Sequence, residues 1–272
     1  MAKTILDVDQ LVVEYPAKGF GKEPFRALHG VSVNIAEHET LGLVGESGSG
    51  KTTLGRALLG LAPITQGQVT FNGQDITHVS RKERAKLSRD IQVVFQDPYT
   101  SLNPSMDIGR ILSEPLQIQG IEKEEANKRI ATLLDQVGLP SDAIHRLPRE
   151  FSGGQRQRVA IARALYGAPK YLVMDEPNAN LDEVGEGQLA ETIQTLKARG
   201  TTIIFTTHRP RLVSIVDYLL VLRGGQQVGF GPAKAMLESV RNLQIVPNPD
   251  GSNVAESGQA NDQTSEVIKS AT

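Results

Sequence analysis

The apolar residues of the chain recur in short runs and in alternating patterns that predict strands along much of the sequence. Apolar runs predict buried strands at residues 91–95 and 171–174, and a further strand is expected at residues 201–205. Alternation with β-branched side chains predicts half-buried strands at residues 5–15 and 27–35, which we expect to join a small antiparallel sheet. Helical patterns lie between the buried strands, and this order predicts an α/β fold.

The pattern changes to helical spacing between residues 97 and 155. We expect helices at residues 108–116, 123–137 and 141–147, separated by prolines and glycines. In the second of these, Ile130, Leu133 and Leu134 recur at the spacing of one helix face. Residues 97–155 are therefore predicted to form an all-helical insertion in the α/β core.

Further elements complete the predicted domain. They are strands at residues 67–71, 216–222 and 226–230, and helices at residues 81–87, 156–165 and 188–198. Asn72-Gly73 is a strong turn signal, and Gly185 and Gly187 disfavour an earlier start of the last helix. Polar residues dominate after about residue 246, so we expect residues 1–246 to fold and residues 247–272 to be a disordered tail.

Composition narrows the possible classes of function. The 272 residues carry a formal net charge of -2 with no long basic run, which argues against a nucleic-acid partner. The absence of cysteine excludes disulfides, thiolate metal sites and thiol catalysis. No apolar run approaches the about 18 residues that span a bilayer. The first residues lack a signal-peptide pattern, so we expect the chain to stay in the cytoplasm.

The most informative stretch is residues 41–61, which predict a short apolar strand, a glycine-rich turn and a helix over residues 51–61. Gly45 to Thr52 fits the phosphate-binding pattern G-x-x-x-x-G-K-[ST]. The glycines allow backbone N–H groups to converge on phosphate oxygens, and the start of the following helix favours negative charge. Lys51 then supplies a cation for the phosphates and Thr52 a hydroxyl for Mg²⁺.

Several other polar residues follow predicted strands or precede predicted helices. Asp175 ends a buried strand, where an unpaired carboxylate is costly, so Mg²⁺ is a reasonable partner; a turn or N-cap aspartate is the alternative. His208 follows another strand, at the edge where open α/β sheets bind ligands. Ser152, Gly153 and Gly154 precede a helix, where they would hold an anion or simply cap the helix.

Five ordered motifs together resemble the nucleotide-binding subunits of ABC transporters. They are GESGSGKTT, the glutamine of VVFQDP, FSGGQ, LVMDEP and TTH. The resemblance implies a P-loop NTPase fold, with a RecA-like parallel core, an antiparallel β subdomain and an inserted α-helical subdomain. It also implies that two subunits enclose two ATP molecules, each held by the phosphate loop of one subunit and the FSGGQ signature of the other.

The resemblance assigns roles to single residues. Glu176 would polarise the attacking water, His208 would contact the γ-phosphate, and Gln96 would sense Mg²⁺ and water. Tyr15 resembles the aromatic residue that stacks on adenine, although Phe20 and Phe25 compete for that role. The implied ATP-binding residues are Tyr15, Gly45, Glu46, Ser47, Gly48, Ser49, Gly50, Lys51, Thr52, Thr53, Ser152, Gly153, Gly154 and Gln155, and the implied Mg²⁺ ligands are Thr52, Gln96 and Asp175.

Two parts of the sequence resemble two different branches of the family. Residues 1 to about 165 resemble the ATPases of peptide and nickel importers, whereas DEPNANLDE and the residues up to about 245 resemble type I secretion ATPases. We therefore hypothesise a mosaic, natural or engineered, that switches between Leu165 and Ala168. Residues 178–182 resemble a segment that crosses to the opposite subunit, so a homodimer and a heterodimer with a sister ATPase both remain open.

The expected function is ATP hydrolysis that powers transport through separate membrane permease subunits, at the cytoplasmic face of the membrane. Import of peptides, nickel or similar small solutes is the preferred function, because the helical insertion, which in this family docks the membrane subunits, lies in the part that resembles importers. A soluble ABC ATPase without a transport role is one alternative. An engineered or mosaic ATP-binding scaffold is another.

Overall fold

The computed structural model describes residues 3–17, 23–95, 102–179, 181–207 and 209–238. The chain forms two compact units: unit 1 comprises residues 1–80 and 206–272, and unit 2 comprises residues 81–205. The predicted tail, residues 247–272, lies outside the described residues.

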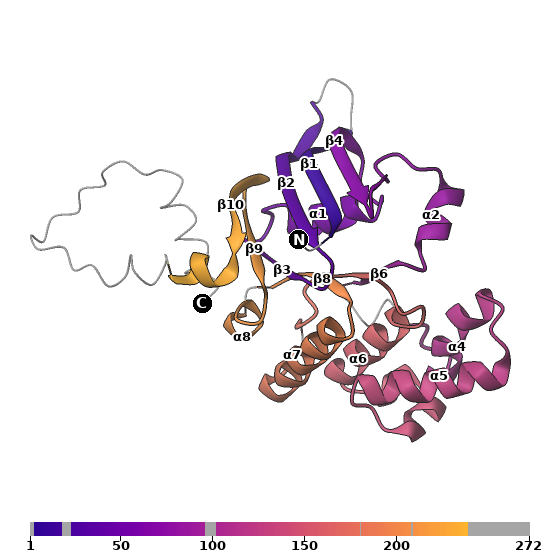
Figure 1. Ribbon diagram of the computed structural model, residues 1–272. Coiled ribbons are helices and arrows are strands. Elements are labelled where there is room, and N and C mark those ends of the chain that lie inside the picture. Colours follow the sequence, from indigo (N-terminus) through magenta and orange to yellow (C-terminus); the bar gives the residue numbers. More distant parts are fainter. Residues whose placement is uncertain (1–2, 18–22, 96–101, 180, 208, 239–272) are drawn as a thin grey trace, which may run out of the picture. The chain divides into compact units, whose positions relative to one another are not determined.

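Unit 1 contains the predicted antiparallel sheet, in the order β2-β1-β4-β5 (Figure 1). Its strands are β1 (Thr4–Tyr15), β2 (Phe25–Ala36), β4 (Ile64–Phe71) and β5 (Gln74–Asp75). Val8 pairs with Val33 on one side and Val69 on the other, so the buried valines of three strands share one row. Asn72 and Gly73 have φ values of 49° and 80° and form the predicted tight turn between β4 and β5.

Unit 1 also contains β3 (Thr40–Val44), β9 (Tyr218–Arg223) and β10 (Gln226–Pro232). β3 runs parallel to β9, and β10 returns antiparallel along the other side of β9. All five residues of β3 are buried, as a strand covered on both faces requires. The short helix α8 (Pro210–Val213) precedes β9, and α1 (Lys51–Leu58) follows β3. α1 is shorter than predicted because the chain turns at Gly60, whose φ is 69°.

Asp217 fixes the start of β3 against the start of β9. The backbone N and Oγ1 of Thr40 both donate to Asp217 Oδ2, at 2.7 and 2.8 Å, and the Asp217 backbone N donates to Thr40 Oγ1 at 3.1 Å. Thr40 is fully buried, so these are the hydrogen bonds that satisfy its polar atoms away from water. The contact sets the register of β3 and thereby the position at which the glycine-rich turn begins.

Unit 2 contains a parallel sheet in the order β8-β7-β6. Its strands are β6 (Ile91–Val94), β7 (Tyr171–Met174) and β8 (Thr202–Thr206). Its helices are α2 (Arg81–Leu87), α4 (Ile108–Ile118), α5 (Lys123–Gln136), η1 (Ser141–His145), η2 (Pro148–Glu150), α6 (Gly153–Ala164) and α7 (Glu183–Ala198). β7 is buried throughout and has a parallel partner on each side, as the continuous apolar run at residues 171–174 predicts.

The helices α4, α5, η1 and α6 pack on one another within unit 2 (Figure 1). Their contact faces are apolar and include Ile111, Leu112, Ile130 and Leu134. Residues 141–147, predicted as a helix, contain the shorter 3₁₀ helix η1. The boundaries of an inserted helical subdomain at residues 97 and 155 stay a prediction.

The start of α7 differs from the prediction. We expected the helix to begin at residue 188 because Gly185 and Gly187 disfavour helix, but it begins at Glu183. Asp182 is the N-cap, and its Oδ1 accepts a hydrogen bond from the Gly185 backbone N at 2.8 Å. The cap and the burial of Gly187 outweigh the low helix propensity of the two glycines.

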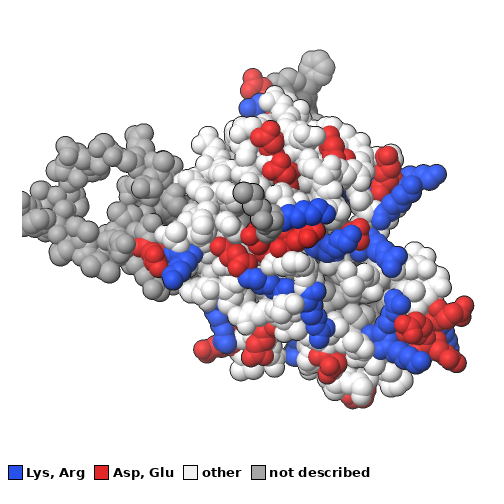
Figure 2. All heavy atoms as spheres, viewed as in Figure 1, with Lys and Arg blue, Asp and Glu red and all other residues white. Residues whose placement is uncertain are grey.

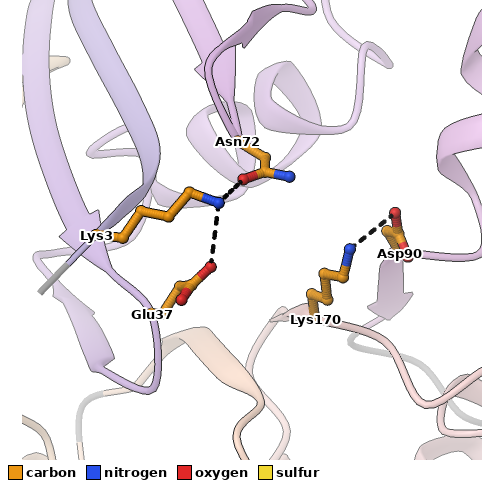
Figure 3. Close-up of polar contacts among 5 residues, drawn as sticks. All are labelled: Lys3, Glu37, Asn72, Asp90 and Lys170. Carbon is orange, nitrogen blue, oxygen red and sulfur yellow. Dashed lines mark hydrogen bonds and ion pairs between the residues drawn. The ribbon is translucent and has the colours of Figure 1, made fainter.

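Charged side chains of both signs are interspersed over the described surface shown in Figure 2. Lys3 contacts Asn72 and Glu37 within unit 1, and Lys170 pairs with Asp90 at 3.7 Å within unit 2 (Figure 3). These pairs are exposed and contribute little to stability. Within the described ranges, none of the helices combines the length and apolar character that crossing a bilayer requires.

We predict that Asp217→Ala destabilises unit 1. It leaves two donors of the buried Thr40 without their acceptor, which costs about 2–4 kcal/mol of unfolding free energy. The matched variant Asp217→Asn keeps one side-chain oxygen as acceptor and should lose clearly less. Urea unfolding followed by circular dichroism measures both, and equal stability of Asp217→Ala and wild type would contradict the clamp.

Candidate functional site

The predicted phosphate loop connects β3 to α1 and passes very close to neighbouring backbone. A Cβ on Gly45 would lie 2.2 Å from the carbonyl oxygen of Leu222, and one on Gly50 would lie 2.7 Å from Leu28 Cδ2. Gly50 also has a φ of 101° and is the residue immediately before α1. Glycine is therefore required at both ends of the turn, since any side chain would push the loop away from β9 and β2.

Lys51 folds back over this loop. Its Nζ donates to the carbonyl oxygens of Gly45 and Glu46, at 2.6 and 2.8 Å, and the residue is 8% exposed. A buried ammonium is costly away from water and is stabilised here by carbonyl dipoles. The same positive charge stands at the beginning of α1, where the helix N-terminus adds a partial positive charge. The loop thus concentrates positive potential suited to phosphate oxygens.

Ser49 supplies the observation that tests whether a phosphate group fits the loop. Its Oγ is buried, with 2% exposure of the residue, and has no hydrogen-bond partner among the described residues. A buried hydroxyl without a partner is rare in folded proteins and calls for a ligand or water. Close glycine backbone, the Lys51 ammonium and this hydroxyl together fit a polyphosphate.

The turn between β9 and β10 is hydrogen-bonded to the phosphate loop. The sequence did not predict this contact. The Gly225 backbone N donates to the Ser49 carbonyl at 3.1 Å, and the Gly225 carbonyl accepts from the His29 backbone N at 2.9 Å. A Cβ on Gly225 would lie 2.5 Å from the Ala27 carbonyl oxygen. The sequence predicts a strand on each side of Gly224-Gly225, but nothing in the local sequence indicates what this turn contacts.

Tyr15 and Phe25, two of the three candidates for an adenine platform, are cross-strand partners at the ends of β1 and β2. Tyr15 is half-buried, whereas Phe25 is 69% exposed. Both rings are thus available at this end of the sheet. Phe20, the third candidate, lies outside the described residues.

Asp175 and Glu176 follow β7 directly in unit 2. The Asp175 backbone N donates to the Val94 carbonyl at 2.9 Å, which continues the β6–β7 pairing to the last residue before the turn. Glu176 has a φ of 44°, a left-handed conformation that is uncommon for a residue with a side chain. Strained backbone of this kind concentrates at functional sites, where the surrounding structure holds it in place.

The segment FSGGQ forms a capped helix start. The Ser152 hydroxyl accepts from the Gln155 backbone N at 3.3 Å, and the Gln155 side chain accepts from the Ser152 backbone N at 3.0 Å. This reciprocal pair is a capping box at the start of α6. The Phe151 ring packs under the guanidinium of Arg146, which lies 4.3 Å from the ring centroid. The capping geometry is what both predicted alternatives for Ser152 require.

The starts of α6 and α7 line one hollow of about 340 Å³ within unit 2. The side chain of Leu181 covers Gly154, since a Cβ there would lie 3.0 Å from Leu181 Cδ2. Arg158 is a residue of this hollow that the sequence did not indicate, and Asp182 was predicted only as part of the segment 178–182. Its position before two glycines was the available signal for its role as a helix cap.

Gln96 and His208, predicted to sense Mg²⁺ and the γ-phosphate, lie outside the described residues. Asn180, within the segment predicted to cross to the opposite subunit, lies outside them as well. The described residues contain no group of three or more His, Cys, Asp or Glu side chains able to hold a metal ion.

Residues 28–179 match the family described as ABC transporter. A Brucella ovis protein named as a putative peptide import ATP-binding protein is 42% identical over 234 residues, which cover 83% of this chain and 74% of the relative. The chain belongs to the ABC transporter family. The glutathione import ATP-binding protein GsiA of Salmonella paratyphi A is 43% identical to this ABC protein over 242 residues, which cover 86% of the chain and 39% of GsiA.

Solved structures of ABC cassettes share the fold of this ABC protein. The dimeric ATP-binding cassette MJ0796 bound to ADP and Pi matches with a TM-score of 0.77 and 28% identity, over 84% of this chain and 99% of that one. CbiO1 from Clostridium perfringens, part of the ABC transporter complex cbiONQ, matches with a TM-score of 0.76 and 28% identity, over 89% and 95%. The predicted P-loop NTPase fold and the ABC-type ATPase are confirmed.

We predict that Lys51→Ala weakens ATP binding by roughly a hundredfold, because it removes the buried ammonium that is expected to bind the phosphates. Titration of the purified chain with a fluorescent ATP analogue measures the affinity. Lys3→Ala is the matched control, since Lys3 is a surface lysine of the same unit that contacts Asn72 and Glu37. Unchanged affinity in Lys51→Ala would refute the assignment of the loop.

Proposed function

We propose that this ABC ATPase binds Mg·ATP through Gly45 to Thr53 and uses its hydrolysis to drive import through separate membrane permease subunits. The observation that carries the proposal is the loop after β3. Its backbone approaches β9 so closely that only glycine fits at residue 45. The same turn holds the Lys51 ammonium and the buried Ser49 hydroxyl, which has no hydrogen-bond partner within the described part of the chain. Such a loop is suited to a polyphosphate.

The proposed metal ion is Mg²⁺, held by the Thr52 hydroxyl, the Asp175 carboxylate and Gln96. Oxygen ligands of this kind suit Mg²⁺, which usually takes one or two carboxylates, substrate phosphates and water. When bound, the ion would neutralise negative charge on the phosphates. Asp175 follows a fully buried strand, which supports a fixed position for its carboxylate.

In the proposed hydrolysis, the Glu176 carboxylate accepts a hydrogen bond from the attacking water and orients it in line with the γ-phosphate. Its left-handed backbone supports this role, because a conformation that costs free energy is usually retained where the direction of a side chain matters. His208 would contact the γ-phosphate. Tyr15 would stack on adenine, with Phe25, its exposed cross-strand partner, as the competing ring.

We further propose that Ser152 to Gln155 act on nucleotide bound by a second ATPase subunit. The starts of α6 and α7 both present a helix N-terminus at one hollow, which favours an anion there. The solved MJ0796 cassette is a dimer bound to ADP and Pi, which supports a dimeric site in this family. The second subunit is either a copy of this chain or a sister ATPase.

The transported solute is proposed to be a peptide, nickel or a similar small compound, because two relatives are named for peptide and glutathione import. The subunit would then act at the cytoplasmic face of the membrane, bound to its permeases. We also propose that the chain is a mosaic of two family branches, which the sequence DEPNANLDE after β7 supports. Comparing ATPase activity with and without membranes, and identifying the permeases that co-purify, separates this proposal from a soluble ATPase or an uncoupled scaffold.

We predict that Glu176→Gln leaves ATP binding intact and slows hydrolysis by about 10²–10⁴-fold. Loss of a carboxylate that acts as general base usually has an effect of this size. The amide keeps the size of the side chain but not its charge. Phosphate release at saturating ATP measures the rate, and fluorescent-nucleotide titration measures the binding. Glu186→Gln, a change to another glutamate of unit 2, is the control, and wild-type turnover in Glu176→Gln would remove Glu176 from the proposed role.

A further inference from the structure

Arg158 lies where three segments of unit 2 meet. It belongs to α6, one turn beyond Gln155, and its Nη1 donates to the carbonyl oxygen of Gly138 at 2.9 Å. Gly138 comes just after α5 and has a φ of 64°, the conformation that ends a helix. A cation near the last carbonyls of a helix interacts favourably with the helix dipole. Arg158 therefore links the end of α5 to the signature helix.

The same side chain faces the start of α7. Arg158 and Asp182 line one hollow together with Ser152 and Gln155. Burial lowers the pKa of Arg158 from its ordinary value, and the negative charge of Asp182 opposes that shift. Asp182 in turn caps α7 through the Gly185 backbone N. One carboxylate therefore serves both the helix start and the arginine.

A second contact joins the same two helix starts. Leu181 Cδ2 lies against Gly154, where a Cβ would come within 3.0 Å of it. The signature glycine and the residue before the α7 cap are thus packed directly on each other. A shift of α7 relative to α6 would break this packing and separate Arg158 from Asp182.

We propose that Arg158 is a positioning residue that holds the end of α5, the signature segment and the start of α7 as one rigid block, so that Ser152 to Gln155 and Leu181-Asp182 meet the nucleotide of a second subunit together. The inference rests on the proposed function, in which two subunits share each ATP. A block of three segments can be oriented once, on docking, whereas three independent segments would each lose conformational freedom at that step.

The experiment uses the full chain with Glu176→Gln as the parent, because slowed hydrolysis lets an ATP-bound dimer accumulate. Light scattering with Mg·ATP measures dimer formation, and titration with fluorescent ATP at low protein concentration measures binding to the single subunit. Arg158→Ala should weaken the dimer by about tenfold and change single-subunit ATP affinity by less than about twofold. Arg158→Lys keeps the charge and should restore part of the loss. Arg129→Ala, a surface arginine of α5 paired with Glu125, is the matched control.

A double-mutant cycle tests the link to Asp182. Asp182→Asn keeps a side-chain oxygen for the α7 cap but removes the charge that faces Arg158. If the two residues act as a pair, the double variant Arg158→Ala, Asp182→Asn should dimerise no more weakly than Arg158→Ala alone. Fully additive losses would show that the two residues act independently and would overturn the block.

The remaining outcomes are distinct. If the parent forms an ATP-dependent dimer and Arg158→Ala dimerises equally well, the inference is wrong and the proposed function stands. If Arg158→Ala loses ATP binding and thermal stability in parallel, Arg158 serves folding and the positioning role is wrong. If the parent binds ATP but forms no dimer with itself or with a co-expressed sister ATPase, the shared site fails and the inference fails with it.

Discussion

The close approach of the Gly45 backbone to β9 is the constraint on which the proposed nucleotide-binding loop of unit 1 depends. The distance of 2.2 Å from a hypothetical Cβ to the Leu222 carbonyl leaves no room for any side chain. The Asp217–Thr40 clamp fixes where β3 starts, and the Gly225–Ser49 hydrogen bond fixes where the loop ends. Lys51 then fills the interior of the turn. A backbone held in this position can bind an anion through its own N–H groups, so long polar side chains are not needed for that purpose.

Helix starts also form the candidate site of unit 2. α6 and α7 begin side by side at one hollow, and each has its own side-chain cap, Ser152 and Asp182. Two helix N-termini in one place concentrate partial positive charge. The carboxylate of Asp182 offsets part of that charge and that of the nearby Arg158 guanidinium.

Local sequence predicted the elements well wherever burial dominates. β7 begins and ends where the apolar run of residues 171–174 does, and Asn72-Gly73 gave the correct turn. The prediction failed where a single side-chain contact decides, as at α7, which starts five residues early because Asp182 caps it. The glycines and Lys51 predict a phosphate loop, and the structure places them in one turn between β3 and α1. The contacts of Gly225 with Ser49 and of Asp217 with Thr40 were not predicted, because these pairs are far apart in sequence and meet only in the tertiary fold.

The central claim is that each ATP is held by the phosphate loop of one subunit and the signature of another. Mixing two inactive variants tests it most directly: Lys51→Ala, which lacks the loop cation, and Gly154→Asp, which blocks the signature. The mixing is done under conditions in which the wild-type chain alone forms an ATP-dependent dimer. Mixed dimers then contain one site with both halves intact, so the mixture should regain up to about a quarter of the wild-type ATPase rate although each variant alone is inactive. A mixture that remains as inactive as its components, or full activity of Gly154→Asp alone, would contradict the account.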